Sequence, residues 1–138
     1  MIIAGGAAYA RVFPMTTIQH RALDKPLMSF SVPEEIAKIK EGDQWKHTRR
    51  GAVTLSKNAD VRTVLVALSE GMEIHEHHAE GPITVYVVEG AINFSASGEQ
   101  RRLAAGSLLA LGGGIPHDVH ALEECAFIIT VVQPREAA

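Results

Sequence analysis

Between residues 51 and 132 the chain carries nine short segments rich in Val, Ile and Leu, each separated from the next by turn residues. The segments are 51–58, 61–69, 73–78, 83–90, 91–97, 99–105, 107–112, 117–122 and 125–132. The turn signals between them include Asn58-Ala59-Asp60 and a run of three glycines at 112–114. Short strands at close and even spacing are typical of a β-sandwich or a β-barrel. The predicted fold class is therefore all-β.

A short helix is predicted before these strands, in the segment SVPEEIAKIKEG of residues 31–42. Ser31 can cap the helix, and Glu34, three residues later, completes a capping box. Pro33 lies in the first turn, where its missing N–H costs little, and Gly42 is placed to end the helix. The sequence therefore predicts one short N-terminal helix in front of an all-β domain.

Composition favours an N-terminal arm over residues 1–27 and a single β-barrel domain over residues 28–138. The 138 residues are 46% hydrophobic, which is enough to bury a core, and their net charge of −3 offers nucleic acid or an anionic membrane no broad attraction. The single cysteine, Cys125, excludes an intrachain disulfide, fits a cytoplasmic location and is expected to be buried and unreactive. The apolar residues 1–14 are either a strand or arm, or they precede a natural start at Met15.

Five of the seven histidines fall between residues 75 and 120, and three of them stand together as His75, His77 and His78. Because alternate residues of a strand face the same way, we expect His75 and His77 on one face and His78 on the other. Two imidazoles at i and i+2 of a strand can bind one metal ion. The alternative is that these polar residues occupy a turn before the next strand.

Glycines and histidines recur in two patterns along the strand-rich region. The patterns are Gly71, His75, His77 and Gly90, followed by Gly106, Gly114 and His117. In these patterns the chain resembles the RmlC-like cupin superfamily over residues 71–121. The resemblance implies a cupin-type jelly-roll β-barrel of two packed antiparallel sheets. It also implies a transition-metal site formed by His75, His77 and His117.

The chain departs from the cupin pattern at three of its positions. Ile83 stands where the family usually carries a glutamate ligand, Gly112 replaces its proline and Ala121 replaces its asparagine. Without the glutamate, both the presence of a metal and its identity among Fe, Ni, Zn, Mn and Cu stay open. Glu73 and His78 are candidate additional ligands, the first only if its strand bends.

The predicted interior suits a small and partly apolar ligand, because its expected walls are aliphatic side chains. These walls are Ile83, Val85, Val87, Leu109 and Leu111. The resemblance implies three possible functions: a metal-dependent oxygenase acting on a small organic molecule, a non-catalytic binding or sensing module, and a metal-free isomerase or epimerase. The isomerase ranks last, since it usually needs a cationic residue for its substrate and no Lys or Arg is predicted inside the barrel.

Three further residues near these positions are expected outside the barrel. Tyr86 is out of phase with the apolar face of its strand, and His120 is out of phase with His117. Asp118 either holds His120 in place or solvates the edge of the sheet.

A homodimer is expected, because the exposed edges of a sheet invite pairing with a second chain. In this prediction residues 15–50 cover the sheet of the partner subunit, with Trp45 near the contact. Alternatively, Trp45 and Phe30 are packing anchors that dock the helix on the chain's own barrel.

Overall fold

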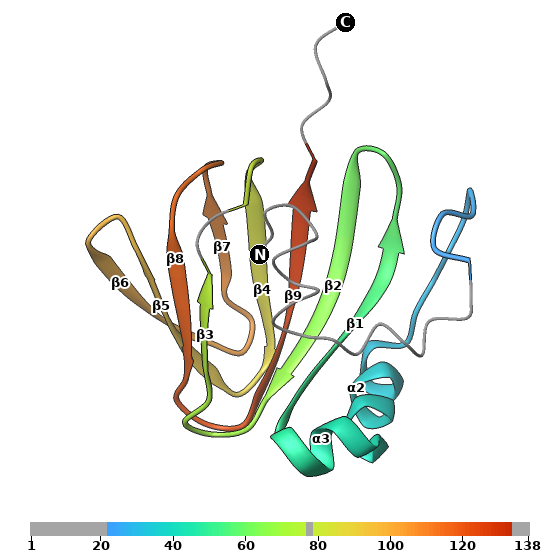
Figure 1. Cartoon of the computed structure of the whole chain (residues 1–138), viewed down its shortest axis with the longest axis horizontal. Helices are drawn as coiled ribbons and strands as arrows, with labels where there is room; N and C mark the ends of the chain where they lie inside the picture. The colour runs from blue at the N-terminus through green and yellow to red at the C-terminus, as the bar shows by residue number, and fades with distance from the viewer. Residues whose placement is uncertain (1–21, 77–78, 134–138) are drawn as a thin grey trace, which may run out of the picture.

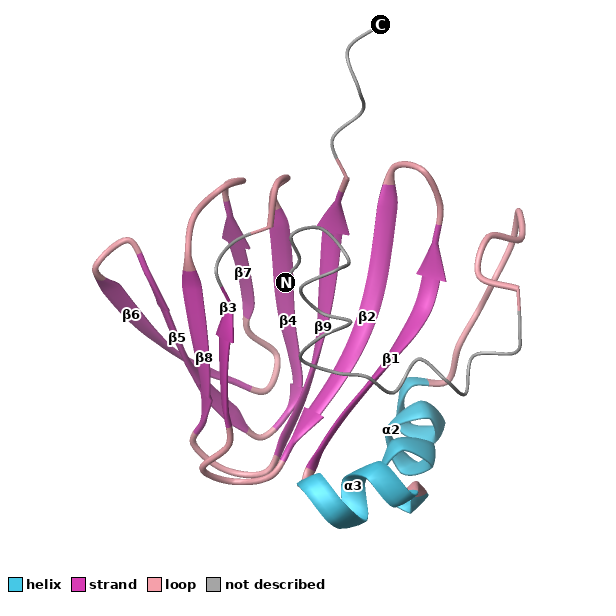
Figure 2. Cartoon of the chain, viewed as in Figure 1, coloured by secondary structure: helices cyan, strands magenta, loops and turns pink. Residues whose placement is uncertain are grey.

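The computed structural model describes residues 22–76 and 79–133 and orders them into helices and strands (Figures 1 and 2). The helices are α2 (Val32–Glu41) and α3 (Asp43–Thr48). The strands are β1 (Arg50–Lys57), β2 (Val61–Leu68), β3 (Glu73–Glu76), β4 (Ile83–Glu89), β5 (Ala91–Ala96), β6 (Glu99–Ala104), β7 (Leu108–Leu111), β8 (His117–Ala121) and β9 (Cys125–Val132). All of the predicted strands are confirmed. His77 and His78 lie outside the described residues.

The strands form two antiparallel sheets that face each other. One sheet has the order β1-β2-β9-β4-β7 and the other has the order β3-β8-β5-β6. Buried side chains from both sheets, among them Phe127 and Ile92, fill the space between them. Along β4 the buried Val85 alternates with the exposed Tyr86, as predicted from the two-residue period. This arrangement confirms the all-β jelly-roll.

Within residues 22–76 and 79–133 two helices precede the strands, one more than predicted. The predicted helix is α2, in which the Ser31 side chain accepts a hydrogen bond from the Glu34 backbone N–H at 3.4 Å. Gly42 ends α2 in an extended conformation, and α3 begins at the next residue. The segment DQWKHT has only Trp45 as a large apolar residue, so it offers no helical periodicity to detect. No helix in the described part of the chain is long and apolar enough to cross a membrane.

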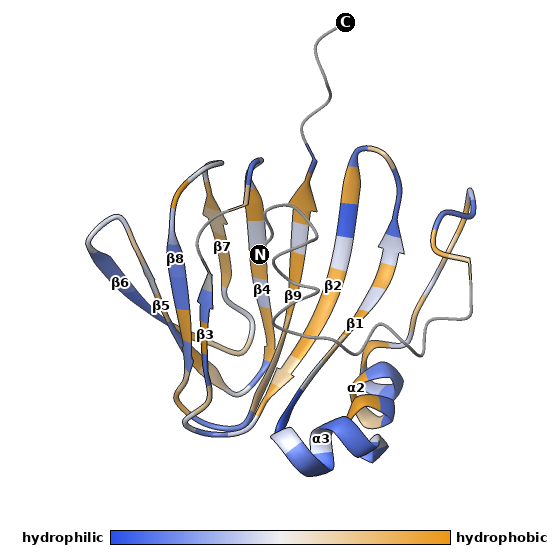
Figure 3. Cartoon of the chain, viewed as in Figure 1, coloured by the Kyte–Doolittle hydropathy of each residue, from blue (hydrophilic) through white to orange (hydrophobic). Residues whose placement is uncertain are grey.

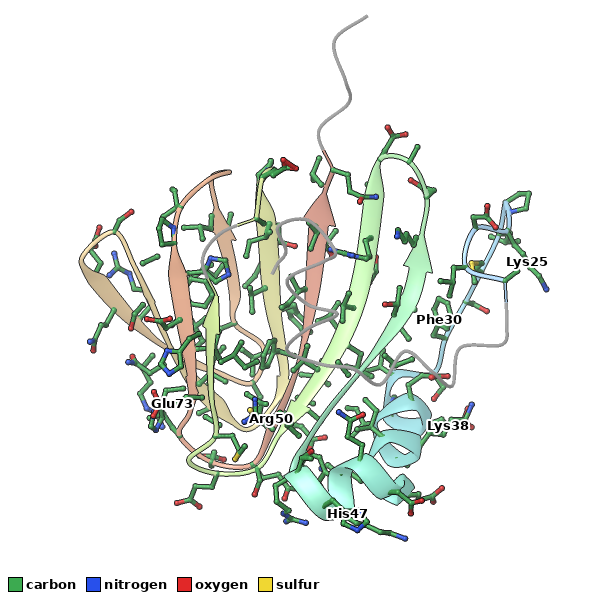
Figure 4. All side chains as sticks on the ribbon, viewed as in Figure 1. Lys25, Phe30, Lys38, His47, Arg50 and Glu73 are labelled. Atoms are coloured by element: carbon green, nitrogen blue, oxygen red, sulfur yellow. The ribbon has the colours of Figure 1, made fainter. Side chains whose placement is uncertain are left out.

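Both helices pack on the outer face of β1 and β2 and form a second core there. Trp45 is 5% exposed and packs with Ile36 and Ile39 of α2 against the sheet. The guanidinium of Arg49 lies 5.1 Å from the Trp45 ring centroid. Phe30 packs against the same cluster beside β1 (Figure 4). Trp45 is thus a packing anchor within its own chain, and the prediction that placed it near a partner subunit loses its main support.

Cys125 begins β9 and is fully buried in the core between the sheets. Burial disfavours the thiolate and raises the pKa of the Cys125 thiol from 9.0 to about 12. The prediction of a buried, unreactive thiol agrees with this environment.

At one end of the barrel the chain just before β4 contacts the connection between β7 and β8. The backbone N–H of Gly114, between β7 and β8, donates to the Ala79 carbonyl oxygen at 2.7 Å. A Cβ on the neighbouring Gly113 would overlap the carbonyl oxygen of Glu80, so glycine is needed for this close approach. Because β8 begins at His117 directly after this contact, we call this part of the molecule the His117 end.

Candidate functional site

His117 is the first residue of β8 and points into the barrel. It is 3% exposed and shares the inner face of the strand with Val119 and Ala121, which are also buried. Its ring stacks on the Phe94 ring with centroids 5.4 Å apart and planes inclined by 12°. The site therefore begins with a histidine held against an aromatic ring at one end of the core.

A backbone contact determines which ring nitrogen of His117 carries the proton. Nδ1 lies 3.0 Å from the Ile115 carbonyl oxygen, which can only accept a hydrogen bond, so Nδ1 carries the proton. In the neutral ring the lone pair is then on Nε2. Metal-binding histidines usually donate their other ring N–H to a backbone carbonyl or a carboxylate in this manner.

His75 lies on the opposite face of the same sheet. Its neighbour Ile74 is 2% exposed and points into the core, so the alternation of β3 turns His75 outward. The His75 side chain is 73% exposed, and its Nδ1 lies 3.3 Å from an oxygen of Asp118. His75 and His117 therefore face away from each other. His77, the third member of the predicted set, lies outside the described residues, as does His78.

Glu73 joins His75 on the outer face and not in the barrel (Figure 4). One of its carboxylate oxygens lies 3.7 Å from Nε2 of His75, and the other lies 3.8 Å from Nδ1 of His120. His120 faces outward as predicted, whereas Asp118 contacts His75 and not His120. These residues border a shallow polar groove of about 350 Å³. Within residues 22–76 and 79–133, no three His, Cys, Asp or Glu side chains are placed to hold a metal ion.

The position that resembles the cupin glutamate ligand points into the barrel. Ile83 is 2% exposed and lies in register between Val131 of β9 and Leu111 of β7. Val85 and Val87 follow it on the same face and are fully buried in the core. This part of the interior is thus tightly packed and apolar, with no carboxylate at Ile83 to serve a metal.

A pocket of about 380 Å³ opens between β6 and β7, at the edges of the two sheets. Leu109 and Leu111, two of the predicted walls, line it together with Phe94 and Leu103. The exposed Arg101 lies at its border and pairs with Glu99 at 2.6 Å. Because Phe94 also stacks on His117, this seam pocket adjoins the histidine through a shared aromatic wall.

Arg62 is a charged residue of the interior that the prediction missed. It lies on β2 in phase with Val64, Val66 and Leu68, which all belong to the core between the sheets, and it is 5% exposed. The prediction that no Lys or Arg lies inside the barrel is therefore wrong. The signal was present in the sequence, because the alternation of VRTVLVAL places Arg62 on the face of its core valines.

The fold is shared with several solved structures. A conserved protein of unknown function from Streptococcus pyogenes is 21% identical, covers 86% of this chain and 100% of its own length, and superposes with a TM-score of 0.64. KdgF from Halomonas sp. is 26% identical, with 63% and 81% coverage and a TM-score of 0.57. Salicylate 1,2-dioxygenase from Pseudaminobacter salicylatoxidans is 14% identical, with a TM-score of 0.69 over 83% of this chain and 37% of its own.

No curated protein matches the sequence significantly. The profile of the cupin domain family, however, matches residues 62–132. This match covers β2 to β9, including the strands that carry Arg62, Ile83 and His117. The chain belongs to the cupin family.

Proposed function

We propose that this cupin binds a divalent transition metal at the His117 end of the barrel and acts there on a small organic molecule. His117 would be one metal ligand through Nε2. The observation that carries the proposal is the hydrogen bond from His117 Nδ1 to the Ile115 carbonyl, on a side chain that is 3% exposed. It holds the ring in the tautomer and orientation that a metal ligand needs.

A further ligand would come from the connection between β3 and β4, where the two-residue alternation assigns His78, and not His77, to the face opposite His75. His77 and His78 follow β3, whose last residue, Glu76, is the backbone partner of His117 in the sheet register. His75 is left out of the set, because its side chain lies on the outer face. Neutral imidazoles suit Fe, Ni, Zn, Mn or Cu, and such an ion would supply Lewis-acid or redox chemistry.

The chain's own residues would bind and orient the organic molecule. Phe94, Leu109 and Leu111 offer an apolar surface that excludes water from the neighbourhood of His117. The similarity to salicylate 1,2-dioxygenase, one structure of which contains adducts with gentisate, supports oxygenase chemistry at the level of a shared fold.

Metal analysis of purified variants tests the proposal. We expect a first-row transition metal in the wild-type protein, loss of that metal in His117→Ala, and full retention in His75→Ala. The His75 variant is the matched control, because it removes an imidazole from the same sheet on the other face. Wild-type protein that takes up no metal, or His117→Ala protein that keeps it, would overturn the proposal.

A non-catalytic binding module is the second candidate. It is favoured by Ile83, which is buried at the position of the usual glutamate ligand and brings no charge to the site. If the wild-type protein is metal-free and yet binds small molecules beside His117, this second function replaces the first.

The homodimer also stays a proposal, with a different contact from the one predicted. Tyr86 and Leu108 are backbone partners on β4 and β7, and they are 42% and 67% exposed. Such an exposed apolar pair near the edge strand β7 supports pairing there between two copies of the chain. Light scattering should give the mass of a dimer, and Leu108→Lys should give a mass of about 15 kDa, as for the 14.8 kDa monomer.

A further inference from the structure

We propose that the organic molecule bound by this cupin has an uncharged, apolar body, such as a single ring or a short alkyl chain, which the seam pocket between β6 and β7 binds. The inference rests on the proposed function in assigning this molecule to the His117 site, and it specifies the chemical class of that molecule. It begins from the pocket of about 380 Å³ and the side chains that line it.

The seam pocket exists because β6 and β7 belong to different sheets although they are consecutive in the chain. The backbone N–H of Ser107 donates to the Ala104 carbonyl oxygen at 3.0 Å, so a tight turn holds the two strands together at one end. β6 is the edge of the four-stranded sheet and β7 is the edge of the five-stranded sheet. Within residues 22–76 and 79–133 no backbone ladder joins them. The space left between the two edges is at the lower end of the roughly 300–1,000 Å³ typical of small-molecule pockets.

The wall of the seam pocket is apolar. Phe94 and Leu103 are 2% and 9% exposed and belong to the core between the sheets. Three partly buried side chains of the wall pack against that core, namely Ala96, Leu109 and Leu111. Such a wall gains free energy when it removes apolar surface of a ligand from water, and it offers no hydrogen bonds in return for a polar group. It therefore favours a ring or an alkyl chain.

The charges at the border of the pocket neutralise each other. Nη2 of Arg101 lies 2.6 Å from a carboxylate oxygen of Glu99, and Nη1 donates to the Gln100 carbonyl oxygen at 3.1 Å. Among the described residues that line the pocket, no other side chain is charged. An ionic group on the ligand would lose hydration without gaining a counter-ion, because each border charge already has a partner. The Ser97 hydroxyl, also at the border, is uncharged and suits a hydroxyl or carbonyl group of a neutral ligand.

The seam pocket adjoins His117 along β5. Phe94 stacks on the His117 ring, and Ala96 is the backbone partner of His117 in the four-stranded sheet. Both residues also line the pocket. A molecule in the seam pocket therefore contacts residues that lie directly beside His117, which connects the pocket to the proposed site.

Probes that share an apolar body and differ in charge test the proposal. We would titrate the full-length protein with hexanol, hexanoate and hexylamine, and with benzyl alcohol, benzoate and benzylamine, by calorimetry at constant ionic strength. Each titration is repeated after treatment with a chelator, because a bound metal would attract the acids independently of the pocket. In the chelator-treated protein we expect the alcohol of at least one series to bind about tenfold or more tightly than its acid and its amine.

Variants then assign the binding to the seam pocket. Ala96→Phe takes up the space of the ligand and should weaken binding of the alcohol about tenfold or more. Ala104→Phe is the matched control, because Ala104 is exposed on β6 and does not line the pocket, and it should bind the alcohol as the wild type does. Leu109→Ala enlarges the pocket and should increase the preference for octanol over hexanol, which tests the same wall if Ala96→Phe does not fold.

The charged pair at the border allows a separate test of charge selectivity. Glu99→Gln leaves Arg101 without its carboxylate and should raise the affinity for hexanoate about threefold at low ionic strength. Arg101→Gln leaves the Glu99 carboxylate and should raise the affinity for hexylamine by a similar factor. The factors are small because the Arg101 and Glu99 side chains are 59% and 64% exposed, and they should decline with added salt. If neither variant changed the charge preference, the pair would not be its cause.

The outcomes separate this inference from the proposed function. Three results would overturn the seam pocket even if the metal is present: no binding of either alcohol by the wild type, acids or amines that bind as tightly as the alcohols in both series after chelation, or unchanged alcohol binding in Ala96→Phe. Wild-type protein that takes up no metal and still binds the alcohol in this pocket would overturn the metal-dependent function and leave the seam pocket in place.

Discussion

Two histidines of the four-stranded sheet, His75 on β3 and His117 on β8, lie on neighbouring strands and have opposite surroundings. His117 faces the core, stacks on Phe94 and is 3% exposed. His75 is the backbone partner of the next residue, Asp118, and its side chain is 73% exposed beside two carboxylates. A shift of one residue along a strand thus separates an oriented, buried imidazole from a solvated one. The face of the sheet on which a histidine lies, more than its spacing in the sequence, decides whether it can bind a ligand inside the barrel.

The strands also differ in hydropathy, according to how much of each strand is covered. β2 and β9, which lie inside the five-stranded sheet, are mainly hydrophobic, whereas β3 and much of β6 are hydrophilic (Figure 3). The helices α2 and α3 cover the outer face of β1 and β2, while the outer face of β3 and β8 carries Glu73, His75 and His120. Substitutions at adjacent inner-facing and outer-facing positions of one strand can therefore test how much the two faces of a sheet differ in their contribution to stability.

The largest effect on the free energy of unfolding is expected from placing a carboxylate on the inner face of β4. Ile83→Glu should lower the free energy of unfolding of the metal-free protein by about 3 kcal/mol or more, because the charge is buried without an ion. With metal present it should raise metal affinity by adding the ligand that the cupin pattern expects. Thr84→Glu, exposed on the other face of β4, should change stability by about 0.5 kcal/mol or less.

Urea unfolding of Ile83→Glu and Thr84→Glu, with and without metal, measures the stability and the metal affinity of both variants. If Ile83→Glu changed neither stability nor metal affinity, Ile83 could not point into the barrel.

Removal of the Phe94 ring that stacks on His117 should lower stability by a similar amount. Phe94→Ala leaves a cavity at a 2% exposed position and should cost about 3–5 kcal/mol of unfolding free energy. Asn93→Ala on the outer face loses one exposed hydrogen bond to Gln100 and should cost about 1 kcal/mol or less. Chemical denaturation of the two variants in parallel provides the measurement, and equal losses would contradict the division between the faces.

The titration of Cys125 probes the inner face of the five-stranded sheet. Its pKa is about 12 in the folded protein against 9.0 for an ordinary thiol, so the unfolded state loses its proton first. The thiol contribution to stability is therefore constant below pH 9 and falls as pH rises from about 9 to 12. A Cys125→Ala variant should lack this part of the pH dependence. Reaction with a thiol reagent at pH 8 should occur only as the protein unfolds, and fast reaction of the native state would show an accessible thiol.

The smallest effect is expected from the outer contact between His75 and Asp118. Asp118→Asn or His75→Ala should change the unfolding free energy by about 0.5 kcal/mol or less, and added salt should reduce the difference further, because both side chains are exposed. Thermal unfolding at low and high ionic strength measures it. A loss as large as that from Phe94→Ala would mean that the outer face has a structural role that its exposure does not suggest.

Much of the fold was predictable because it depends on local patterns. The alternation of apolar residues and the turn residues between them located β1 to β9, and Ser31 with Glu34 located the start of α2. α3 was missed because its six residues owe their conformation to the burial of Trp45 against the sheet. A contact with a distant segment produces no detectable hydrophobic periodicity in a sequence of six residues.

The sequence by itself determined the all-β architecture, the capped helix, the buried Cys125 and the resemblance that the cupin profile confirms. Only the tertiary structure decided which face of β3 turns inward, because a two-residue period says which residues share a face and not which face is buried. Ile74 decided it by entering the core, and this turned His75 outward. Alternation groups Arg62 with Val64, Val66 and Leu68, and the sheet then showed that this face of β2 lies between the sheets, where the row of Arg62 meets Val131 and Ile83.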